Sequence, residues 1–409
     1  MMKQKKTIWI INQYASTPET GMGGRHYYLA TELAKQGHKV YLIAASYTHL
    51  LRKPPNIKHE FQVQEVFQNM NFVWVKLPSY HEAHSKQRVF NWFIFSNKIR
   101  KLTTIIHEKP DLILYSSPSL IGYLGSKWLA NFYKAKYCFE VRDIWPLTLL
   151  ELGGYSKSHP FIRLLQWIED RAYKKSDFVI SNLFNAVEHM KSRGMQEKKF
   201  SWIPNGFPLD EVSDPEPLEA NVIDMIPKNK FIVGYTGTIG VANAIDTLIE
   251  AAVFTKKNPE IHYVLVGEGK EKISMQQKAL ELEVVNITFI DSIPKKQIQS
   301  MLGLFDICYI GWHKNPLYRF GIAPNKIPEY LYAKKPIIHA FSGKGDLVKQ
   351  ANAGLTVEAE NPKAVAEGII TIYNLTNSQR EQLGKNGQEF VLKNFTYSSL
   401  AKKIVNIID

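Results

Sequence analysis

The chain has 409 residues, more than one ordinary hydrophobic core accommodates, so two domains are expected. With 45% hydrophobic and 22% charged residues the composition is that of a globular protein, and the absence of any apolar run of about 18 residues argues against a membrane-spanning helix. Cys138 and Cys308 both lie in apolar runs, which argues against a disulfide framework or a cysteine metal site and is typical of reduced, buried thiols in the cytosol.

The net charge of +13 is distributed unevenly along the chain. Residues 1–205 carry 29 lysines and arginines against 15 acidic residues, a net charge of +14, whereas residues 206–409 carry 22 against 23, a net charge of −1. A basic half indicates a polyanionic neighbour, such as nucleic acid, an anionic membrane surface or a phosphorylated substrate. A lysine-rich proteome would raise the total charge but does not explain the asymmetry.

The first half alternates short β-rich runs with segments of helical periodicity. The basic start leads into a short apolar run that predicts a first strand rather than a signal peptide. Strands are expected at residues 7–14, 39–46, 72–78, 111–117, 136–143, 177–182 and 200–206, and helices at 25–36, 85–108, 120–133 and 159–174, with another after 182. This alternation predicts a parallel sheet with crossover helices.

A stretch rich in proline and acidic residues then interrupts the pattern, and we interpret residues 207–228 as a linker. The alternation resumes with strands expected at 230–240, 262–269, 287–291, 307–311, 335–341 and 353–360, and helices at 244–256, 270–282, 294–303, 324–333, 361–373, 377–391 and 395–407. The chain is therefore expected to form two doubly wound, Rossmann-like α/β domains, residues 1–206 and 229–390. Residues 391–409 are expected to form a closing helix that packs back on the first domain.

The first expected strand is followed by a glycine-rich loop. Gly21, Gly23 and Gly24 precede the helix at 25–36, and free amides at a helix start suit a phosphate. A nicotinamide dinucleotide is disfavoured, because roughly ten residues separate the strand from the first glycine, His26 replaces the third glycine, and no carboxylate ends the second strand. A diphosphate remains the expected ligand, and a plain long turn closed by glycines is the alternative.

Six motifs occur in a characteristic order along the whole chain. They are GGRHYYLATELAKQGHKV (23–40), RDIWP (142–146), IPNG (203–206), GYTGTIG (234–240), VGEG (266–269) and YRFGIAPNKIPEYLYAKKPII (318–338). Together they resemble the family 4 retaining glycosyltransferases of the GT-B fold, and the branch that adds N-acetylated sugars in O-antigen and capsule assembly. The resemblance implies two domains facing a central cleft, a UDP-sugar donor and an undecaprenyl-diphosphate-linked or other glycan acceptor.

The GYTGTIG motif predicts a turn that approaches the donor diphosphate, with contacts from Thr238 and Gly240. The family often has an arginine and a lysine after this strand, but Thr238 and Asn243 stand there. Charge that develops on the departing diphosphate still requires a cation. We expect Lys326 first and Arg319 second in this role; the alternative is that both are surface residues without a ligand.

Glu329 matches the second glutamate of the family's E-x7-E motif, which accepts hydrogen bonds from the nucleotide ribose. Gly321 stands where the first glutamate is expected, so the contact to the sugar ring is expected from the backbone around Ile322, Ala323 and Asn325. The loss of this carboxylate suits a different sugar, such as a 6-deoxy or acetamido sugar. Glu329 is otherwise a solvated helix residue.

Other candidates follow strands at their carboxyl ends, where ligands bind in such folds. Glu268 is expected near the donor, with a simple turn residue as the alternative, and the resemblance places the backbone of Ser292 and Ile293 against the base, uracil. Asp143 is expected to contact the transferred sugar or to orient or deprotonate the acceptor hydroxyl. A purely structural ion pair with Arg142 is the alternative.

The segment 85–109 mixes aromatic residues with lysines and arginines. As a helix it presents a broad apolar face edged by cations, which is typical of an interfacial membrane helix and equally of a crossover helix packed on a sheet. The charge asymmetry favours contact with an anionic membrane. We therefore expect a cytoplasmic protein, peripheral on the inner face of the cell membrane, whose basic first domain binds the acceptor.

The expected reaction is retaining transfer with same-face attack, in which a phosphate oxygen assists the acceptor's proton. No cofactor and no metal are expected, because no suitable D-x-D pattern or histidine cluster occurs and chain cations answer the leaving diphosphate. A sugar-nucleotide epimerase, a phosphorylase, an inactive sugar- or nucleotide-binding regulator and a nucleic-acid-binding protein are the alternatives. No lysine motif for pyridoxal phosphate and no base-reading module support the phosphorylase or the nucleic-acid binder.

Overall fold

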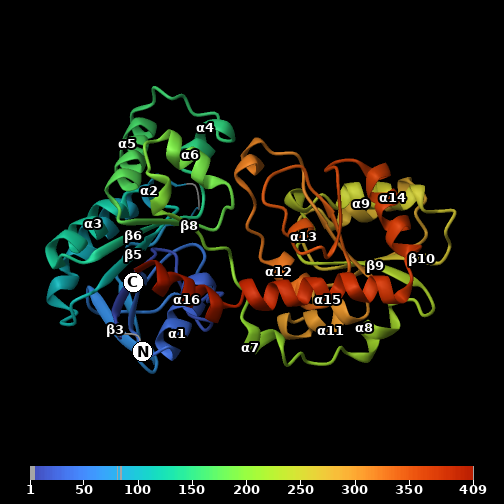
Figure 1. The fold of residues 1–409 in the computed structure, drawn as a ribbon, viewed down its shortest axis with the longest axis horizontal. Helices are drawn as coiled ribbons and strands as arrows, with labels where there is room; N and C mark the ends of the chain where they lie inside the picture. The colour runs from blue at the N-terminus through green and yellow to red at the C-terminus, as the bar shows by residue number, and fades with distance from the viewer. Residues whose placement is uncertain (1–4, 81, 83–84, 409) are drawn as a thin grey trace. The chain divides into compact units, whose positions relative to one another are not determined.

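The computed structural model describes residues 5–80, 82 and 85–408. It contains two compact units: the first runs up to Asn205 and includes the C-terminal segment from Tyr397, and the second comprises Gly206–Thr396 (Figure 1). Each unit is an α/β domain built on its own sheet, so the predicted fold class, two Rossmann-like parallel-sheet domains, is confirmed.

The sheet of the first unit has the strand order β3-β4-β2-β1-β5-β6-β7-β8. All neighbouring pairs are parallel except β3 and β4, which form an antiparallel pair at one edge. The central strands are apolar and buried on both faces, as parallel strands between two helical layers must be. The strands are β1 (Thr7–Ile11), β2 (Lys39–Ala45), β3 (Phe61–Phe67), β4 (Met70–Val75), β5 (Leu112–Ser116), β6 (Lys136–Val141), β7 (Phe178–Ser181) and β8 (Phe200–Trp202).

Helices cover both faces of this sheet. Helices α1 and α16 pack together on one face, and α2, α3 and α5 lie together on the other (Figure 1). The helical segments are α1 (Arg25–Lys35), α2 (Lys86–Lys98), η1 (Ile99–Thr104), α3 (Gly122–Tyr133), α4 (Leu147–Glu151), α5 (Pro160–Lys175), α6 (Ala186–Ser192), η2 (Glu197–Lys199) and α16 (Tyr397–Ile408). The C-terminal helix α16 therefore belongs to the core of the first unit, where Tyr397 stacks on Tyr28 with ring centroids 5.1 Å apart.

The second unit has a fully parallel sheet in the order β11-β10-β9-β12-β13-β14. Its chain order reverses between β9 and β12, which places a topological switch point at the centre of the sheet. The strands are β9 (Phe231–Thr236), β10 (Ile261–Val266), β11 (Ile287–Ile290), β12 (Ile307–Gly311), β13 (Ile337–Ala340) and β14 (Gly354–Val357).

In this unit α9, α10 and α14 pack on one face of the sheet, and α12 and α15 pack together in the other layer. The helical segments are α7 (Leu209–Val212), α8 (Ala220–Asp224), η3 (Val241–Asn243), α9 (Ile245–Phe254), α10 (Lys272–Glu281), η4 (Lys295–Gln297), α11 (Ile298–Gly303), η5 (Pro316–Phe320), α12 (Lys326–Tyr332), α13 (Leu347–Gln350), α14 (Pro362–Tyr373) and α15 (Asn377–Asn394).

The structure differs locally from the expected elements. The antiparallel strand β3 and the short helix α4 are additional, and the helix expected at 85–108 gives way after Lys98 to the 3-10 segment η1. The segment 207–228, interpreted as a linker, carries α7 and α8 and is attached to the second unit: Glu216 N donates to Lys296 O at 3.0 Å, and Gln297 Nε2 donates to Pro217 O at 3.0 Å. These hydrogen bonds hold a segment without hydrophobic periodicity against its domain.

Candidate functional site

The switch point of the second unit lies between β9 and β12. Ligands of open parallel sheets bind outside the carboxyl ends of the strands at such a point. Two segments follow these strands: the glycine turn Gly237–Gly240 after β9, and the loop 312–325 after β12, which leads into α12. Lys326 and Glu329, both candidates from the sequence, lie in α12.

Glycines allow the turn after β9 to pack closely on the turn after β10. Gly267 has φ +150°, and a Cβ atom there would lie 1.9 Å from Gly237 O. A Cβ atom on Gly269 would lie 2.0 Å from Ile239 O. Gly237 N donates to Val266 O at 2.9 Å. The GYTGTIG and VGEG motifs are therefore two halves of one interlocked structure, and side chains at these positions would separate them.

The alternation of hydrogen bonds in this turn leaves two amides available. Ile239 N donates to Glu268 O at 2.9 Å, and Gly237 N donates to Val266 O at the end of β10. In the described part of the chain, the amides of Thr238 and Gly240 donate no hydrogen bond. Loop amides without a partner in the chain can bind phosphate oxygens, and both residues were expected in the donor site.

Lys326 is half-buried beside the same turn. Its Nζ donates to the Tyr235 hydroxyl and to Asn243 Oδ1, the latter at 3.0 Å, and lies 4.2 Å from the centroid of the Tyr235 ring. Burial lowers the pKa of Lys326 to about 8, against the opposing effect of Glu329. The predicted first cation of the site is thus brought to the predicted glycine turn. Asn243, noted in the sequence only as a missing charge, is its hydrogen-bond partner.

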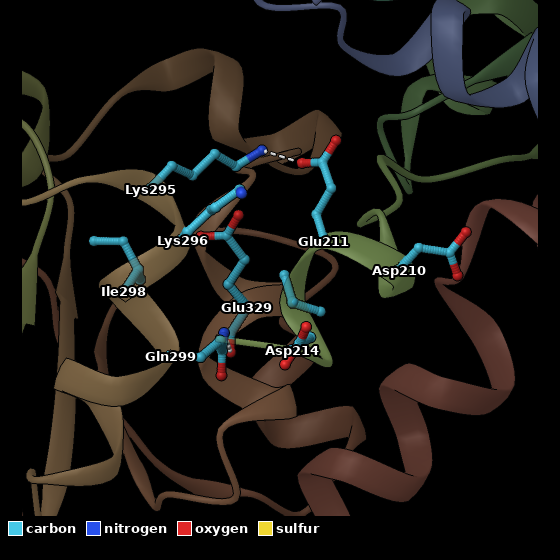
Figure 2. Close-up of a pocket in the computed structure, with 9 residues that line it drawn as sticks. Asp210, Glu211, Asp214, Lys295, Lys296, Ile298, Gln299 and Glu329 are labelled. Carbon is cyan, nitrogen blue, oxygen red and sulfur yellow. Dashed lines mark hydrogen bonds and ion pairs between the residues drawn. The ribbon is translucent and has the colours of Figure 1, made fainter. Parts of the chain in front are cut away.

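Glu329 lines a cavity of about 320 Å³ together with residues of α7, η4 and α11 (Figure 2). Figure 2 shows Lys295 paired with Glu211, at 3.0 Å, at this cavity. Burial raises the pKa of the Glu329 carboxyl and Glu211 adds to that increase, while Lys295 and Lys326 oppose it. The cavity, with carboxylate and amide acceptors on its wall, is suited to a polar, hydroxyl-bearing ligand.

The second predicted cation, Arg319, is exposed at the end of η5. Its Nη1 donates to Pro316 O at 2.6 Å, and its guanidinium lies 4.4 Å from the centroid of the Phe320 ring. Gly321 follows with φ +99°, a conformation in which a side chain would be strained. This explains why the glutamate expected at this position is a glycine.

The backbone candidates Ile322, Ala323 and Asn325 lie between Gly321 and the first residue of α12. Ile322 is buried, whereas Asn325 is exposed. The structure thus arranges these residues along the segment that connects η5 to Lys326.

Glu268 and the 291–293 segment follow the neighbouring strands β10 and β11. Lys272 Nζ donates to Glu268 Oε1 at 2.6 Å and also to Asp291 Oδ1. The hydrogen bond from Lys272 and its positive charge lower the pKa of the Asp291 carboxyl. Ser292 is exposed and Ile293 half-buried directly after Asp291. Lys272, which the motif analysis did not single out, ties the two predicted strand ends together.

In the first unit the corresponding switch point lies between β1 and β5. The predicted glycines lie in the loop after β1: Gly23 and Gly24 have φ +65° and +81°, and Gly24 is the N-cap residue of α1. A Cβ atom at Gly24 would meet open space, so its glycine is required by backbone conformation alone. The structure thus accounts for these two glycines without a ligand, and their role in phosphate binding stays a prediction.

A buried charged cluster lies just beyond this loop. Arg25 Nε donates to Glu140 Oε1 at 2.9 Å, and Arg25 Nη2 donates to Ile203 O at 2.9 Å. His26 Nε2 lies 2.7 Å from Glu140 Oε2 and 2.9 Å from Ser116 Oγ. Arg25 and the other cations hold the pKa of Glu140 well below its usual range against burial, and burial lowers the pKa of His26. The cluster connects α1, β5, β6 and the segment after β8.

Asp143 is exposed two residues after the end of β6. The surrounding protein raises the pKa of its carboxyl, and the neighbouring Arg142 opposes this increase. No Arg142–Asp143 salt bridge within 4.0 Å is present in the described chain; Arg142 N instead donates to Ser117 Oγ at 2.9 Å. The carboxylate therefore remains accessible, whereas Glu140, on the same strand, is fully buried.

The segment 85–109 contains the crossover helix α2 and the 3-10 segment η1, and one face of α2 is exposed. Trp92 and Phe95 of α2 are buried, and Trp92 Nε1 donates to Tyr14 OH at 2.7 Å. Phe90 and Phe93 remain 69% and 41% exposed. Both interpretations of this segment therefore retain a structural basis: one face packs in the domain and the other presents aromatic side chains to solvent.

Three features of the described residues concern metals, membranes and thiols. No group of three or more histidine, cysteine, aspartate or glutamate side chains is arranged to hold a metal ion. None of the described helices has the length and apolar character needed to cross a membrane. Cys138 and Cys308 are free and buried, as predicted, and burial raises the pKa of both thiols.

Some site residues were not found in the sequence. Tyr235 lies inside a recognised motif, but only the fold shows its hydroxyl beside Lys326. Glu140 stands alone in the apolar run KYCFEV, and a lone carboxylate in a buried strand signals a partner. The signal does not say that the partner is Arg25, which is 115 residues away in sequence.

Two family models match the chain. The model described as Glycosyltransferase Family 4 matches residues 20–211, and the model described as Glycosyl transferases group 1 matches residues 221–390. Each match corresponds approximately to one unit of the structure, and together they leave only the two ends of the chain and a short connecting segment unmatched.

The chain is also similar to individual proteins. It is 24% identical to WcaI of Escherichia coli K12, over 86% of this chain and 89% of WcaI. The name of WcaI describes it as a glycosyl transferase of colanic acid biosynthesis. Sucrose-phosphate synthase of Thermosynechococcus elongatus has a similar fold, with a TM-score of 0.70, 18% identity and 98% coverage of both chains. HepE of Anabaena, solved with UDP and glucose, gives a TM-score of 0.63 at 14% identity, again with 98% coverage of both.

Proposed function

Since the chain belongs to the family 4 glycosyltransferases of the GT-B fold, we propose that it transfers a sugar from a UDP-sugar to a glycan acceptor with retention of anomeric configuration. The observation that carries the donor proposal is Lys326, held beside the glycine turn of β9. A diphosphate bound there meets one ammonium group and the amides of Thr238 and Gly240. That HepE was solved with UDP supports the choice of nucleotide.

Glu329 and its cavity supply the adjoining nucleoside site. Glu329 lies three residues after Lys326 in α12, so one short helix presents the cation and the carboxylate together. The carboxylate accepts hydrogen bonds from the ribose hydroxyls, and the backbone of Ser292 and Ile293 lies against the uracil. Glu268 is held near the donor by Lys272. Arg319 contributes a second cation from η5.

The sugar lies along the segment from Gly321 to Asn325, where amides of Ile322 and Ala323 replace the missing glutamate. The motif order of the branch that transfers N-acetylated sugars, together with the glycine at position 321, supports an acetamido sugar as the substrate. In the reaction the bond between the anomeric carbon and the phosphate oxygen breaks, and the diphosphate leaves with the electron pair. The acceptor oxygen bonds to the same face, and its proton passes to a phosphate oxygen.

The first unit binds the acceptor in this proposal. Asp143 is accessible at the end of β6 and orients the acceptor hydroxyl. Gly23 and Gly24 hold an anionic group through the amides of their loop. A lipid-linked acceptor in surface polysaccharide synthesis is supported by the naming of WcaI for colanic acid biosynthesis. The basic charge of this half and the exposed Phe90 and Phe93 support a peripheral position on the inner face of the cell membrane.

Calorimetry with UDP, GDP and uridine, followed by turnover assays, tests this function. We expect UDP to bind more tightly than uridine, and Lys326→Ala to lower turnover about a hundredfold while uridine affinity is unchanged. Lys278→Ala, which removes a half-buried lysine of α10 paired with Glu250 of α9, is the matched control and should behave as wild type.

The assay's other outcomes separate the alternatives. NMR of the product should show the anomeric configuration of the donor, and EDTA should leave turnover unchanged because chain cations and amides neutralise the diphosphate. Conversion of the UDP-sugar without acceptor would instead identify an epimerase, and binding without any turnover would identify a regulator. Binding of none of the nucleotides would remove the donor proposal.

A further inference from the structure

The side chains around Lys326 form a closed ring of hydrogen bonds. Lys326 Nζ donates to the Tyr235 hydroxyl and, at 3.0 Å, to Asn243 Oδ1. The Tyr235 hydroxyl donates to Thr238 O at 2.6 Å, and Asn243 Nδ2 donates to the same carbonyl at 2.9 Å. Three elements contribute to the ring: α12, β9 and η3, the last two joined by the glycine turn.

The direction of every hydrogen bond in this ring follows from the Thr238 carbonyl. A carbonyl oxygen only accepts, so the Tyr235 proton and the Asn243 amide nitrogen are both committed to it. The Tyr235 oxygen lone pair and Asn243 Oδ1 then face Lys326 as acceptors. An ammonium group has three N–H donors, and two are used in this way. The third remains for a ligand.

The backbone of Lys326 is held independently of its side chain. Thr236 N donates to the hydroxyl of Tyr330 at 2.7 Å, and that hydroxyl donates to Thr236 O at 3.1 Å. Tyr330 lies one helical turn after Lys326, so this contact docks α12 on the end of β9. Gly237 provides the space, because a Cβ atom there would lie 2.4 Å from Lys326 Cε. The ammonium position is thus determined before any ligand binds.

We infer that Tyr235 and Asn243 are positioning residues for donor cleavage, which hold the Lys326 ammonium with a single N–H directed to the diphosphate. This inference rests on the proposed function. The inference also gives Asn243 a role. At a position where the family often has a further cationic side chain, Asn243 instead orients the ammonium of Lys326. A preorganised cation stabilises developing charge without reorganising during the reaction.

The ring also determines how readily Lys326 keeps its proton. Both acceptors stabilise the charged form, whereas burial lowers the pKa of Lys326 to about 8. The titratable groups that face the ammonium are the Tyr235 phenol on β9 and Glu329 on its own helix. Removing an acceptor therefore lowers the pKa of Lys326 further, and a carboxylate at position 243 raises it.

UDP binding measured from pH 6 to 9.5 tests the inference. Wild type should bind UDP with steady affinity between about pH 7, where the terminal phosphate is largely ionised, and pH 8, and progressively less tightly above pH 8, because the diphosphate requires the ammonium. Tyr235→Phe and Asn243→Ala should each weaken UDP binding about tenfold and lower the pH at which affinity falls, with uridine affinity unchanged. Asn243→Asp should move that pH upward. Tyr309→Phe and Asn286→Ala, which remove hydroxyl and amide bonds to Ala244 O and Ile261 O in the same unit, should match wild type.

The titration of Lys326 itself provides a readout without nucleotide. NMR of protein labelled with [¹³Cε]lysine follows its pKa without altering the ammonium group, and the signal is assigned by its absence in Lys326→Arg. Unchanged UDP affinity and unchanged Lys326 titration in Tyr235→Phe and Asn243→Ala would overturn the positioning role, even when wild type binds UDP. If wild type bound no UDP although the variants shifted the titration, the proposed function would fail and the ring would remain an arrangement without a donor.

Discussion

Buried ionisable side chains occur near the central switch point of each unit. In the first unit Glu140 is fully buried between Arg25 and His26, and in the second Lys326 is half-buried between Tyr235 and Asn243. The two arrangements differ in function. Both carboxylate oxygens of Glu140 have partners within the chain, Arg25 and His26, which is typical of a structural ion pair. Lys326, in contrast, keeps one N–H donor for a ligand. Removing one partner of the buried pair would cost about 3–5 kcal/mol of stability.

Acidification should destabilise the first unit in two steps. Burial lowers the pKa of His26 below 6.5, so protonation favours the unfolded chain, and the free energy of unfolding should fall as the pH drops below about 6.5. The pKa of Glu140 lies well below 4.5, so its contribution is present above that pH and is lost only as the pH falls further. Thermal denaturation between pH 2 and 8 measures both effects.

Variants assign the first step. His26→Gln should flatten the pH dependence just below about pH 6.5, where one such group contributes up to about 1.4 kcal/mol per pH unit. His262→Gln is the matched control: burial also lowers the pKa of His262, but it lies on β10 of the second unit. An unaltered pH profile of the first unit's transition in His26→Gln would contradict the assignment.

At the scale of elements, the turn after β9 and the helix α12 form one structural assembly. The turn requires glycine at position 237, where φ is +135°, and the space above that glycine is filled by the Lys326 side chain. Tyr330 then fastens α12 to Thr236 at the end of the same strand. The spacing of Lys326, Glu329 and Tyr330 in a single short helix therefore directs one side chain to the turn, one to the cavity and one to the sheet.

Gly237→Ala should damage binding more than folding. The new Cβ atom would lie 2.6 Å from Lys326 Nζ and would displace the ammonium, and the backbone strain should cost about 1–3 kcal/mol. We expect UDP affinity to fall at least about tenfold, with uridine affinity retained, in calorimetry below the melting temperature. Gly303→Ala, whose Cβ atom would meet open space in α11, is the control. Wild-type UDP affinity in Gly237→Ala would show that Lys326 does not need this space.

For the whole molecule, the distribution of charge distinguishes the two halves of the chain. Residues 1–205 carry the excess of positive charge, and the aromatic residues of α2 and α3 lie exposed on this half. On α3, Trp128 stacks on Phe132 with centroids 5.4 Å apart, and Arg100 lies 5.6 Å from the Trp128 ring. Aromatic rings beside cations are suited to a membrane interface, where each basic residue near anionic lipid adds about 1 kcal/mol.

Vesicle sedimentation at several salt concentrations should reveal this preference. Vesicles rich in anionic phospholipid should bind the protein, neutral vesicles should bind little, and salt should weaken the binding because the attraction is electrostatic. Phe90→Ser with Phe93→Ser should reduce binding several-fold. Ile273→Ser with Leu280→Ser removes apolar groups of the second unit that are even more exposed and should have no effect. Equal loss in both double variants would argue against a membrane face on the first unit.

Much of the fold was predictable, because it depends on patterns that are local in the sequence. Apolar runs at regular spacing predicted thirteen of the fourteen strands of the described chain in order, including the strands before the glycine turns. The edge strand β3 was missed because its side chains are mostly exposed and its apolar residues, in FQVQEVF, are interrupted by polar ones instead of forming an apolar run. The end of α2 was misplaced because η1 continues its periodicity with a tighter turn. The sequence predicted a closing helix over residues 391–409 that packs back on the first domain, and the structure adds which side chains of α16 enter the core of the first unit.

The sequence by itself determined the two Rossmann-like domains, the family and the identity of Lys326 and Glu329 as candidates, since hydrophobic periodicity and glycine motifs are written along the chain. Only the tertiary structure decided which groups surround them: Tyr235 and Asn243 lie 91 and 83 residues from Lys326, and Glu140 lies 115 residues from Arg25. Hydrogen bonds and burial depend on distance in space, and the order of strands in the sheet, rather than the order of residues, brings these side chains together.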